Sequence, residues 1–398
     1  MDILSKRILE MTPSATVELA GKIAELKAQG VDILSFSVGE PDFPTPQNIV
    51  DAAKDALDAG FTKYTAAAGI VELREAVCEK LKRDNGLDYT SAEIIVTTGA
   101  KQAIYNALMA ICNPGDEVII PTPCWVSYVE MVKLTGAKPV LVEAKEEDGF
   151  IPALDAIEAA VTDRTKAILF NSPNNPTGAV YDADTLRGLG RMALEKDFWL
   201  ISDEIYEALV YDGARHYSVA ALVPDVKHRC IIINGVSKSY SMTGWRIGYA
   251  AGPARTIKGM GSLQGHSTSN ATSFAQKASV EALRGPQESV KVMHDEFARR
   301  REFMIRRLNE MPGVRCADVK GAFYAFPNVA ALYGKSAGGR TISNSGDLAA
   351  YLLDEAHIAV VPGAAYEAPD YIRLTYATSM EDIREGMDRM ERCIRALQ

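Results

Sequence analysis

The chain has 398 residues, of which 47% are hydrophobic and 24% charged, an ordinary composition for a globular protein. Its formal net charge of −9 and the absence of a basic run argue against a nucleic-acid partner. No signal peptide precedes the first amphipathic segment, and no apolar stretch approaches the roughly 20 residues of a membrane span, so we expect a cytoplasmic protein without a membrane partner.

The N-terminal part predicts a helix from Thr16 to Gln29 and a short strand from Ile33 to Val38. A loop with fixed prolines, Gly39–Pro44, then stops the strand, as is typical of loops that present backbone to a ligand. Six cysteines without a Cys-x-x-Cys pair predict reduced thiols, and five isolated histidines give no metal-ligand spacing. We therefore expect no metal site.

From about residue 93, short apolar runs alternate with helical segments. The predicted strands are Glu93–Thr97, Glu117–Pro121, Lys138–Val142, Lys166–Asn171, Phe198–Asp203, Cys230–Asn234 and Ile247–Ala251. Several lack polar alternation, as strands buried on both faces do. The pattern predicts an α/β fold with a mostly parallel sheet that helices flank on both sides.

The pattern changes after Gly285-Pro286. A charged amphipathic helix is predicted from Gln287 to Glu310, followed by an α+β tail with strands near Ala322–Phe326, Ile358–Val361 and Tyr371–Tyr376. We therefore predict a large domain of residues 46–285, and a smaller α+β domain formed by residues 1–45 together with 286–398.

Ligands of open parallel sheets bind beyond the carboxyl ends of the strands, so the residues after each strand are informative. Thr98–Gln102 follows the first strand with small residues and leads into a helix at Ala103–Cys112, which suits either an anion or a simple tight turn. Ser172–Gly178 follows a later strand with two prolines and two asparagines; it is either a polar turn or a set of amide donors.

Two further strand ends carry charge. Asp203 ends an apolar strand, where a carboxylate either caps a helix or meets a protonated heterocycle. Lys238 lies in a largely neutral stretch, and burial beside Arg246 would lower its pKa and make it a nucleophile toward a carbonyl. Arg246 itself suits a phosphate. An amine, an acid and a phosphate cradle fit a phosphorylated pyridine aldehyde, and no dinucleotide or P-loop glycine motif is present.

These segments resemble the class I aminotransferases of pyridoxal-phosphate fold type I over essentially the whole chain. The matching motifs are Val38–Phe43, Tyr64, Ser172–Gly178, Asp203–Tyr206, Ser237-Lys238, Arg246–Gly248 and Arg373–Tyr376. Tyr64-Thr65, Cys124–Tyr128 and Met242–Arg246 are most similar to the bacterial branch that contains the thermophile-type aspartate aminotransferases.

The resemblance implies a pyridoxal 5′-phosphate site and roles for its residues. Lys238 would bind the cofactor aldehyde and shuttle the substrate proton, and Asp203 would keep the pyridine nitrogen protonated. Asn175 and Tyr206 would hydrogen-bond the ring hydroxyl, with Trp125 stacked on the ring. The phosphate would be held by Gly99, Ala100, Lys101, Ser237 and Arg246. Tyr64 would reach the phosphate from a neighbouring subunit, so the resemblance implies a homodimer with shared sites.

The implied substrates are an amino acid and a 2-oxo acid. Arg373 would bind the substrate α-carboxylate, and the Gly39 backbone would assist, with Trp125 and Asn175 beside the substrate. Lys101 resembles a lysine that contacts the distal carboxylate in the bacterial branch, although its place at a helix start also fits a surface lysine. Two features depart from parts of the family: Gly235 stands where some relatives have a serine, and Gln264–Thr268 has no arginine for a second carboxylate.

Aspartate aminotransferase is accordingly the expected activity, with 2-oxoglutarate as the acceptor. An aminotransferase that prefers aromatic amino acids, alanine or prephenate is a close alternative. A β- or γ-eliminating lyase would keep the cofactor and change the reaction. A ligand-sensing module is a further alternative, but the motifs begin by residue 38 and leave no room for a preceding DNA-binding segment.

Overall fold

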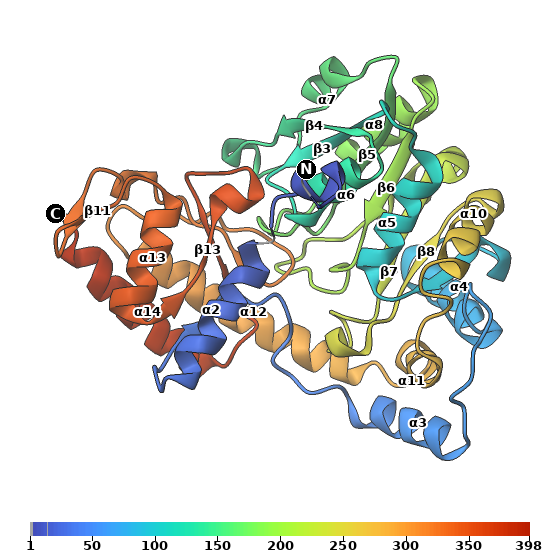
Figure 1. The fold of residues 1–398 in the computed structure, drawn as a ribbon, viewed down its shortest axis with the longest axis horizontal. Coiled ribbons are helices and arrows are strands. Elements are labelled where there is room, and N and C mark those ends of the chain that lie inside the picture. Colours follow the sequence, from blue (N-terminus) through green and yellow to red (C-terminus); the bar gives the residue numbers. More distant parts are fainter. Residues whose placement is uncertain (1–2, 14) are drawn as a thin grey trace.

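The computed structural model describes residues 3–13 and 15–398 (Figure 1). Its largest feature is a seven-stranded sheet in the order β2-β8-β7-β6-β5-β3-β4. The strands are β2 (Ile94–Thr97), β3 (Glu117–Thr122), β4 (Lys138–Glu143), β5 (Thr165–Asn171), β6 (Trp199–Asp203), β7 (Cys230–Gly235) and β8 (Gly248–Ala251). Only β8 runs against both of its neighbours, β2 and β7. The α/β fold class with a mostly parallel, mixed sheet is confirmed.

Helices cover both faces of this sheet because its strands bury side chains on both faces. Ile94 and Val96 belong to one core, whereas Ile95 between them belongs to the other, as the alternation of strand side chains requires. The first core is covered by α3 (Gln47–Asp58), α4 (Val71–Asn85), α7 (Leu154–Ala160), α8 (Ala183–Glu195), α9 (Val219–Leu222) and α11 (Ser273–Arg284). The second is covered by α5 (Ala100–Ile111), α6 (Ser127–Leu134) and α10 (Ala254–Gly265).

The segment from α2 (Ala15–Ala28) to β1 (Leu34–Ser35) and the C-terminal third of the chain form a second group of elements beside the sheet (Figure 1). Strand β1 pairs in parallel with β12 (Ile358–Ala359). An antiparallel sheet has the order β13-β14-β9, and β10 pairs with β11. The helices of this group are α2, α12 (Glu288–Asn309), α13 (Ser345–Ala356) and α14 (Met380–Ala396). The short α1 (Lys6–Leu9) lies instead beside α6 at the large sheet. The remaining strands are β9 (Tyr324–Ala325), β10 (Ser336–Ala337), β11 (Arg340–Thr341), β13 (Val361–Pro362) and β14 (Ile372–Thr375).

Most predicted elements are present with ends shifted by one to three residues, and a few differ in kind. The strand expected over Ile358–Val361 is two short strands, β12 and β13, which pair with different partners. The helix expected to begin at Ala103 begins at Ala100, because Gly99 with φ +80° caps it. The division into residues 46–285 and 1–45 with 286–398 stays a prediction. Among the described residues, no helix is both long enough and apolar enough to cross a bilayer.

Candidate active site

A cavity of about 400 Å³ lies at the carboxyl ends of the sheet strands and is also walled by residues of the second group. It brings together residues that are far apart in the sequence, because the ends of β5 and β6 and the turn after β7 meet at one edge of the sheet. The predicted site residues that line it are Gly39, Ala100, Lys101, Trp125, Asn175, Asp203, Tyr206, Ser237, Lys238, Arg246 and Arg373. Gly99 does not line the cavity itself, but it directly precedes Ala100.

Lys238 lies in the turn after β7 and is half-buried. Its Nζ donates a hydrogen bond to the carbonyl oxygen of Gly39 over 2.5 Å. Burial is the main cause that lowers the pKa of Lys238 to about 8. The charge of Glu40 opposes this shift, whereas Arg373 and Arg246 add to it. A lysine with this pKa is partly neutral near pH 7 and is therefore a competent nucleophile toward a carbonyl.

Asp203 ends β6 and is buried, with only 4% of its surface exposed. Its Oδ2 accepts a hydrogen bond from the Tyr128 hydroxyl over 2.6 Å, and its Oδ1 accepts one from the Ile205 amide over 3.2 Å. Burial raises the pKa of Asp203 to about 6, although both hydrogen bonds act in the opposite direction. The charged carboxylate is therefore costly in this position until a cation meets it.

An anion cradle lies where α5 begins. Gly99 caps this helix, and the first amides of a helix together with its dipole attract negative charge. A Cβ on Gly99 would lie 2.5 Å from Nη2 of Arg246, and a Cβ on Gly248 would lie 2.2 Å from the Ala100 nitrogen. Glycine at both positions therefore lets a guanidinium and a helix N-terminus approach one point, with the Ser237 hydroxyl in the same wall.

Arg373 on β14 is buried, with 2% of its surface exposed. Its Nη2 donates to the carbonyl oxygen of Ser37 over 2.5 Å, and its Nη1 donates to Oδ1 of Asn175 over 3.1 Å. Its guanidinium carbon lies 4.4 Å from the ring centroid of Tyr324. Because these partners are neutral, neither compensates the positive charge of the buried guanidinium. A bound carboxylate would compensate it.

Aromatic side chains border the space between these charges. The hydroxyls of Tyr206 and Tyr324 lie 2.9 Å apart, within hydrogen-bonding distance. Burial raises the pKa of Tyr206 well above its ordinary value. Trp125 packs edge-to-face against Tyr128, with ring centroids 5.4 Å apart. The site thus offers both flat apolar surface and phenol groups to an aromatic ligand.

Lys101 is exposed at the start of α5, yet it lines the cavity. Its Nζ lies 4.7 Å from the ring centroid of Trp125. Burial, with the nearby charge of Arg246, lowers the pKa of Lys101. The structure therefore places this lysine both at a helix start and at the cavity.

Tyr64 lies apart from the cavity and exposes 89% of its surface. Its expected role depends on a second subunit, so a single chain leaves that role a prediction.

Among the cavity residues that were not assigned from the sequence, two tyrosines contact assigned site residues. Tyr128 donates to Asp203, and Tyr324 contacts Tyr206 and would meet a Cβ on Gly39 at 2.6 Å from its hydroxyl oxygen. The motif Cys124–Tyr128 pointed to the neighbourhood of the first. No local pattern marks Tyr324, because its contacts depend on how the second group lies against the sheet.

Comparison with known proteins identifies the family. The sequence model of the family "Aminotransferase class I and II" matches residues 31–390 of the chain. The chain therefore belongs to the class I and II aminotransferases, a family that uses pyridoxal phosphate.

Individual relatives are similar over their full length. The chain is 49% identical to an aspartate aminotransferase of Geobacillus stearothermophilus, covering 99% of both chains. It is 48% identical to an aspartate/prephenate aminotransferase of Cereibacter sphaeroides, covering 98% of both. The solved structure of a Thermus thermophilus aspartate aminotransferase with maleate matches with a TM-score of 0.93 and 44% identity, over 99% of this chain and 100% of that one. The resemblance to this family is thus confirmed.

Proposed function

We propose that this chain is a pyridoxal-phosphate-dependent aspartate aminotransferase, which moves the amino group of L-aspartate to 2-oxoglutarate by a ping-pong route. One observation carries the proposal: Lys238, Asp203 and Arg373 line the same cavity, so an amine, an acid and a carboxylate-binding group face one space. The names of the full-length relatives support aspartate as the donor.

The residues present fit the cofactor. The anion cradle of Gly99, Ala100, Ser237 and Arg246 matches a phosphate in charge and in the close approach that glycine permits. Asp203 is a buried acid that a protonated ring nitrogen would compensate. When bound, pyridoxal phosphate supplies an aldehyde and an aromatic ring that accepts electrons from the substrate α-carbon.

The chain's own residues then have separate tasks. Lys238 would hold the cofactor through its aldehyde and, once freed, would carry a proton on its Nζ from the substrate α-carbon to the former aldehyde carbon. Asp203 keeps a proton on the ring nitrogen, and Tyr206 with Asn175 donates hydrogen bonds to the ring hydroxyl. Trp125, which lines the cavity, would pack against the ring and exclude water from it.

Substrate binding rests on Arg373, which uses only two of the five N–H donors of its guanidinium on neutral partners. The backbone at Gly39 borders the same space. Lys101 is the group proposed to contact a distal carboxylate. The maleate named with the Thermus thermophilus relative is a dicarboxylate, which supports a dicarboxylic substrate here.

A panel of amino donors with 2-oxoglutarate tests the function. We expect aspartate to be turned over faster than alanine, phenylalanine and tyrosine, and Lys101→Ala to lower aspartate turnover more than alanine turnover. An equal loss on both donors would remove the distal-carboxylate role from Lys101. Faster turnover with prephenate than with 2-oxoglutarate as the amino acceptor would select the alternative that the Cereibacter sphaeroides relative's name suggests. Pyruvate and ammonia released without an acceptor would select a lyase.

The proposed assembly is a homodimer in which Tyr64 completes the partner's phosphate site. The exposed position of Tyr64 fits a contact made across subunits. Mixing Lys238→Ala subunits with Tyr64→Ala subunits tests this, because the mixed dimer holds one site with an intact lysine and a Tyr64 from the other chain. We expect that site to regain wild-type cofactor affinity. No regain in mixed dimers would contradict a role across subunits.

Six free cysteines fit a reducing compartment such as the cytoplasm.

A further inference from the structure

A buried carboxylate stands directly behind Asp203. Glu204 follows Asp203 in the chain and has 1% of its surface exposed, but it does not line the active-site cavity. Side chains of successive residues in extended backbone point to opposite faces. Asp203 therefore faces the cavity, and Glu204 faces the protein interior together with Ser202.

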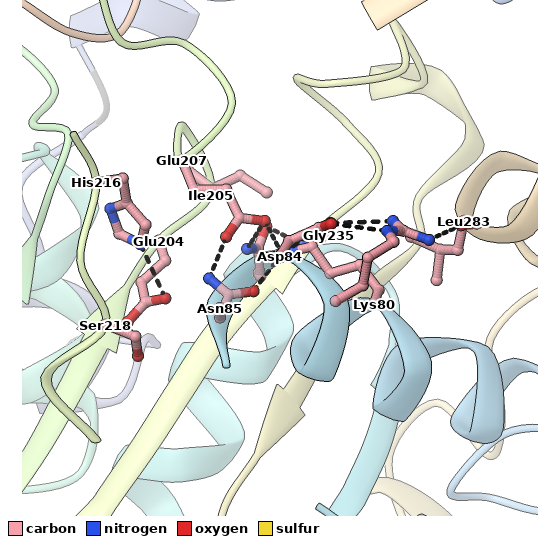
Figure 2. Close-up of polar contacts among 12 residues, drawn as sticks. Lys80, Asp84, Asn85, Glu204, Ile205, Glu207, His216, Ser218, Gly235 and Leu283 are labelled. Atoms are coloured by element: carbon pink, nitrogen blue, oxygen red, sulfur yellow. Dashed lines mark hydrogen bonds and ion pairs between the residues drawn. The ribbon is translucent and has the colours of Figure 1, made fainter. Parts of the chain in front are cut away.

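Glu204 accepts hydrogen bonds from three side chains. The hydroxyls of Ser202 and Ser218 both donate to Oε1 over 2.9 Å. Oε2 lies 3.2 Å from Nε2 of His216, as Figure 2 shows on its left side. A carboxylate has no proton to give, so the histidine nitrogen is the donor. Glu204 is thus a buried carboxylate in contact with an imidazole.

A second, half-buried carboxylate, Glu207, lies at the other end of the same turn. Its oxygens accept hydrogen bonds from Lys80, Asn85 and Asn234. Figure 2 shows Glu207 between the Glu204–His216 pair and the end of α4 that carries Lys80 and Asn85. Ligand atoms of Glu204, Glu207 and His216 lie within 4.8 Å of one another, but the donors already bound to Glu207 make this a charged hydrogen-bond network.

The charges of this network balance only if His216 is an imidazolium. Lys80 compensates Glu207 directly, which leaves Glu204 with His216 as its cation. Although burial acts against the charged ring, the hydrogen bond to Glu204 and the charges of Glu204 and Glu207 raise the pKa of His216; Lys80 opposes them. Other titratable groups border the adjoining cavity that His216 lines: Asp84, Arg215, Tyr240 and Tyr249.

We propose that Glu204, with protonated His216 as its counter-ion, is a positioning residue that fixes the Asp203–Glu207 turn and sets the electrostatic charge behind Asp203. The inference rests on the proposed function, in which Asp203 holds the proton of the cofactor nitrogen. Main-chain hydrogen bonds support the positioning role of Glu204, because the Glu204 amide donates to the Ile233 carbonyl and the Glu207 amide donates to the Glu204 carbonyl. The two glutamates therefore anchor both ends of the turn that presents Asp203 and Tyr206.

The electrostatic consequence has a definite direction. Burial is the main cause of the raised pKa of Asp203, and the negative charge of Glu204 adds to it. His216 as a cation cancels much of that charge. Replacing it by a neutral donor leaves a net negative charge behind the cofactor, which favours the more protonated form of the bound cofactor.

The test compares cofactor-loaded wild type, His216→Gln and the double variant Glu204→Gln/His216→Gln. Glutamine keeps a donor near the position of Nε2 without a charge, and the double variant has an uncharged pair. His294→Gln is the matched control, because His294 contacts the Val210 carbonyl and lies apart from the cavity. The readout is the midpoint pH at which the visible absorption of the bound cofactor changes.

We expect His216→Gln to raise this midpoint by roughly half a pH unit, from one unscreened charge near the site. The double variant and His294→Gln stay at the wild-type midpoint. An unchanged midpoint in His216→Gln, or an equal rise in the double variant, would overturn the inference.

Imidazole signals of isotope-labelled wild type give a second measurement that needs no folded variant. The inference requires the His216 ring to remain charged at pH 7, and a ring that is neutral at pH 7 would overturn it. These outcomes are separable from the proposed function. Failure of wild type to transaminate any donor would refute the function, while a transaminating wild type with an unshifted His216→Gln midpoint would refute this inference alone.

Discussion

The Tyr128 hydroxyl donates a 2.6 Å hydrogen bond to Oδ2 of Asp203, and both side chains are buried. Tyr128 lies in the first turn of α6, which follows β3, whereas Asp203 ends β6. The contact therefore joins two strand ends of the same sheet edge and holds the carboxylate in one orientation. It also opposes the effect of burial on the pKa of Asp203.

Tyr128→Phe removes this donor and raises the pKa of Asp203 further, so the shared proton shifts toward the carboxylate and the cofactor ring nitrogen is less fully protonated. Loss of one hydrogen bond to a charged group lowers kcat by about tenfold. Steady-state kinetics with saturating aspartate measure it. Tyr89→Phe is the control, because Tyr89 is a buried tyrosine that does not line the cavity. Equal kcat values for Tyr128→Phe and Tyr89→Phe would show that the contact has no role in catalysis.

Asp203→Asn separates catalysis from stability. Its transamination rate falls by orders of magnitude, because an amide does not hold the ring-nitrogen proton. In cofactor-free protein, however, the pKa of Asp203 rises from 3.8 unfolded to about 6 folded. The ionised carboxylate therefore lowers the free energy of unfolding by about 3 kcal/mol at pH values above the folded pKa. This destabilisation disappears at pH values below the unfolded pKa.

Thermal unfolding of the cofactor-free proteins measures this cost. Asp203→Asn gains stability relative to wild type, and the gain is larger at pH 8 than at pH 5. A gain that shrinks as the pH rises would contradict the direction of the pKa shift.

Gly248 is expected to tolerate no side chain. A Cβ there would lie 2.2 Å from the Ala100 nitrogen and 2.4 Å from the Gly99 carbonyl carbon, so Gly248→Ala displaces the start of α5 and weakens the phosphate cradle. We expect a loss of stability of roughly 1–3 kcal/mol, as overpacking costs, and a higher cofactor dissociation constant.

Gly259→Ala is the matched control for this prediction. Gly259 lies in α10, where a Cβ meets nothing within 4 Å, so alanine raises stability by about 0.5–1 kcal/mol through helix propensity. Denaturant unfolding and cofactor titration compare the two variants. Wild-type cofactor affinity in Gly248→Ala would show that the cradle does not depend on this close approach.

Cofactor uptake has a pH dependence set by Lys238. Its pKa in the folded protein is lowered to about 8, so half of the amine is neutral near that pH and nearly all of it roughly one to two pH units higher. The rate of reconstitution of cofactor-free protein, followed by visible absorption, rises from about pH 6 and reaches a plateau by about pH 10. A rate that keeps rising above about pH 10, as for an ordinary lysine, would contradict the lowered pKa.

Much of this architecture follows from local patterns. Lys238, Asp203 and Arg246 stand at strand ends in the sequence, and the parallel order of β5, β6 and β7 brings such ends to one edge. Local pattern does not predict that β8 runs antiparallel, since a short apolar run looks the same in a parallel and in an antiparallel strand. Tyr324 and the Ser37 carbonyl were not assigned, because they reach the site only through packing between distant segments.

The account depends on Lys238 as the residue that carries the cofactor. Reduction of the cofactor-loaded protein with borohydride makes that bond permanent, and peptide mass spectrometry then locates the modified lysine. We predict a single phosphopyridoxyl adduct on Lys238 that is absent from Lys238→Ala. An adduct on Lys101 instead, or none in a protein that still transaminates, would contradict the assignment of the site.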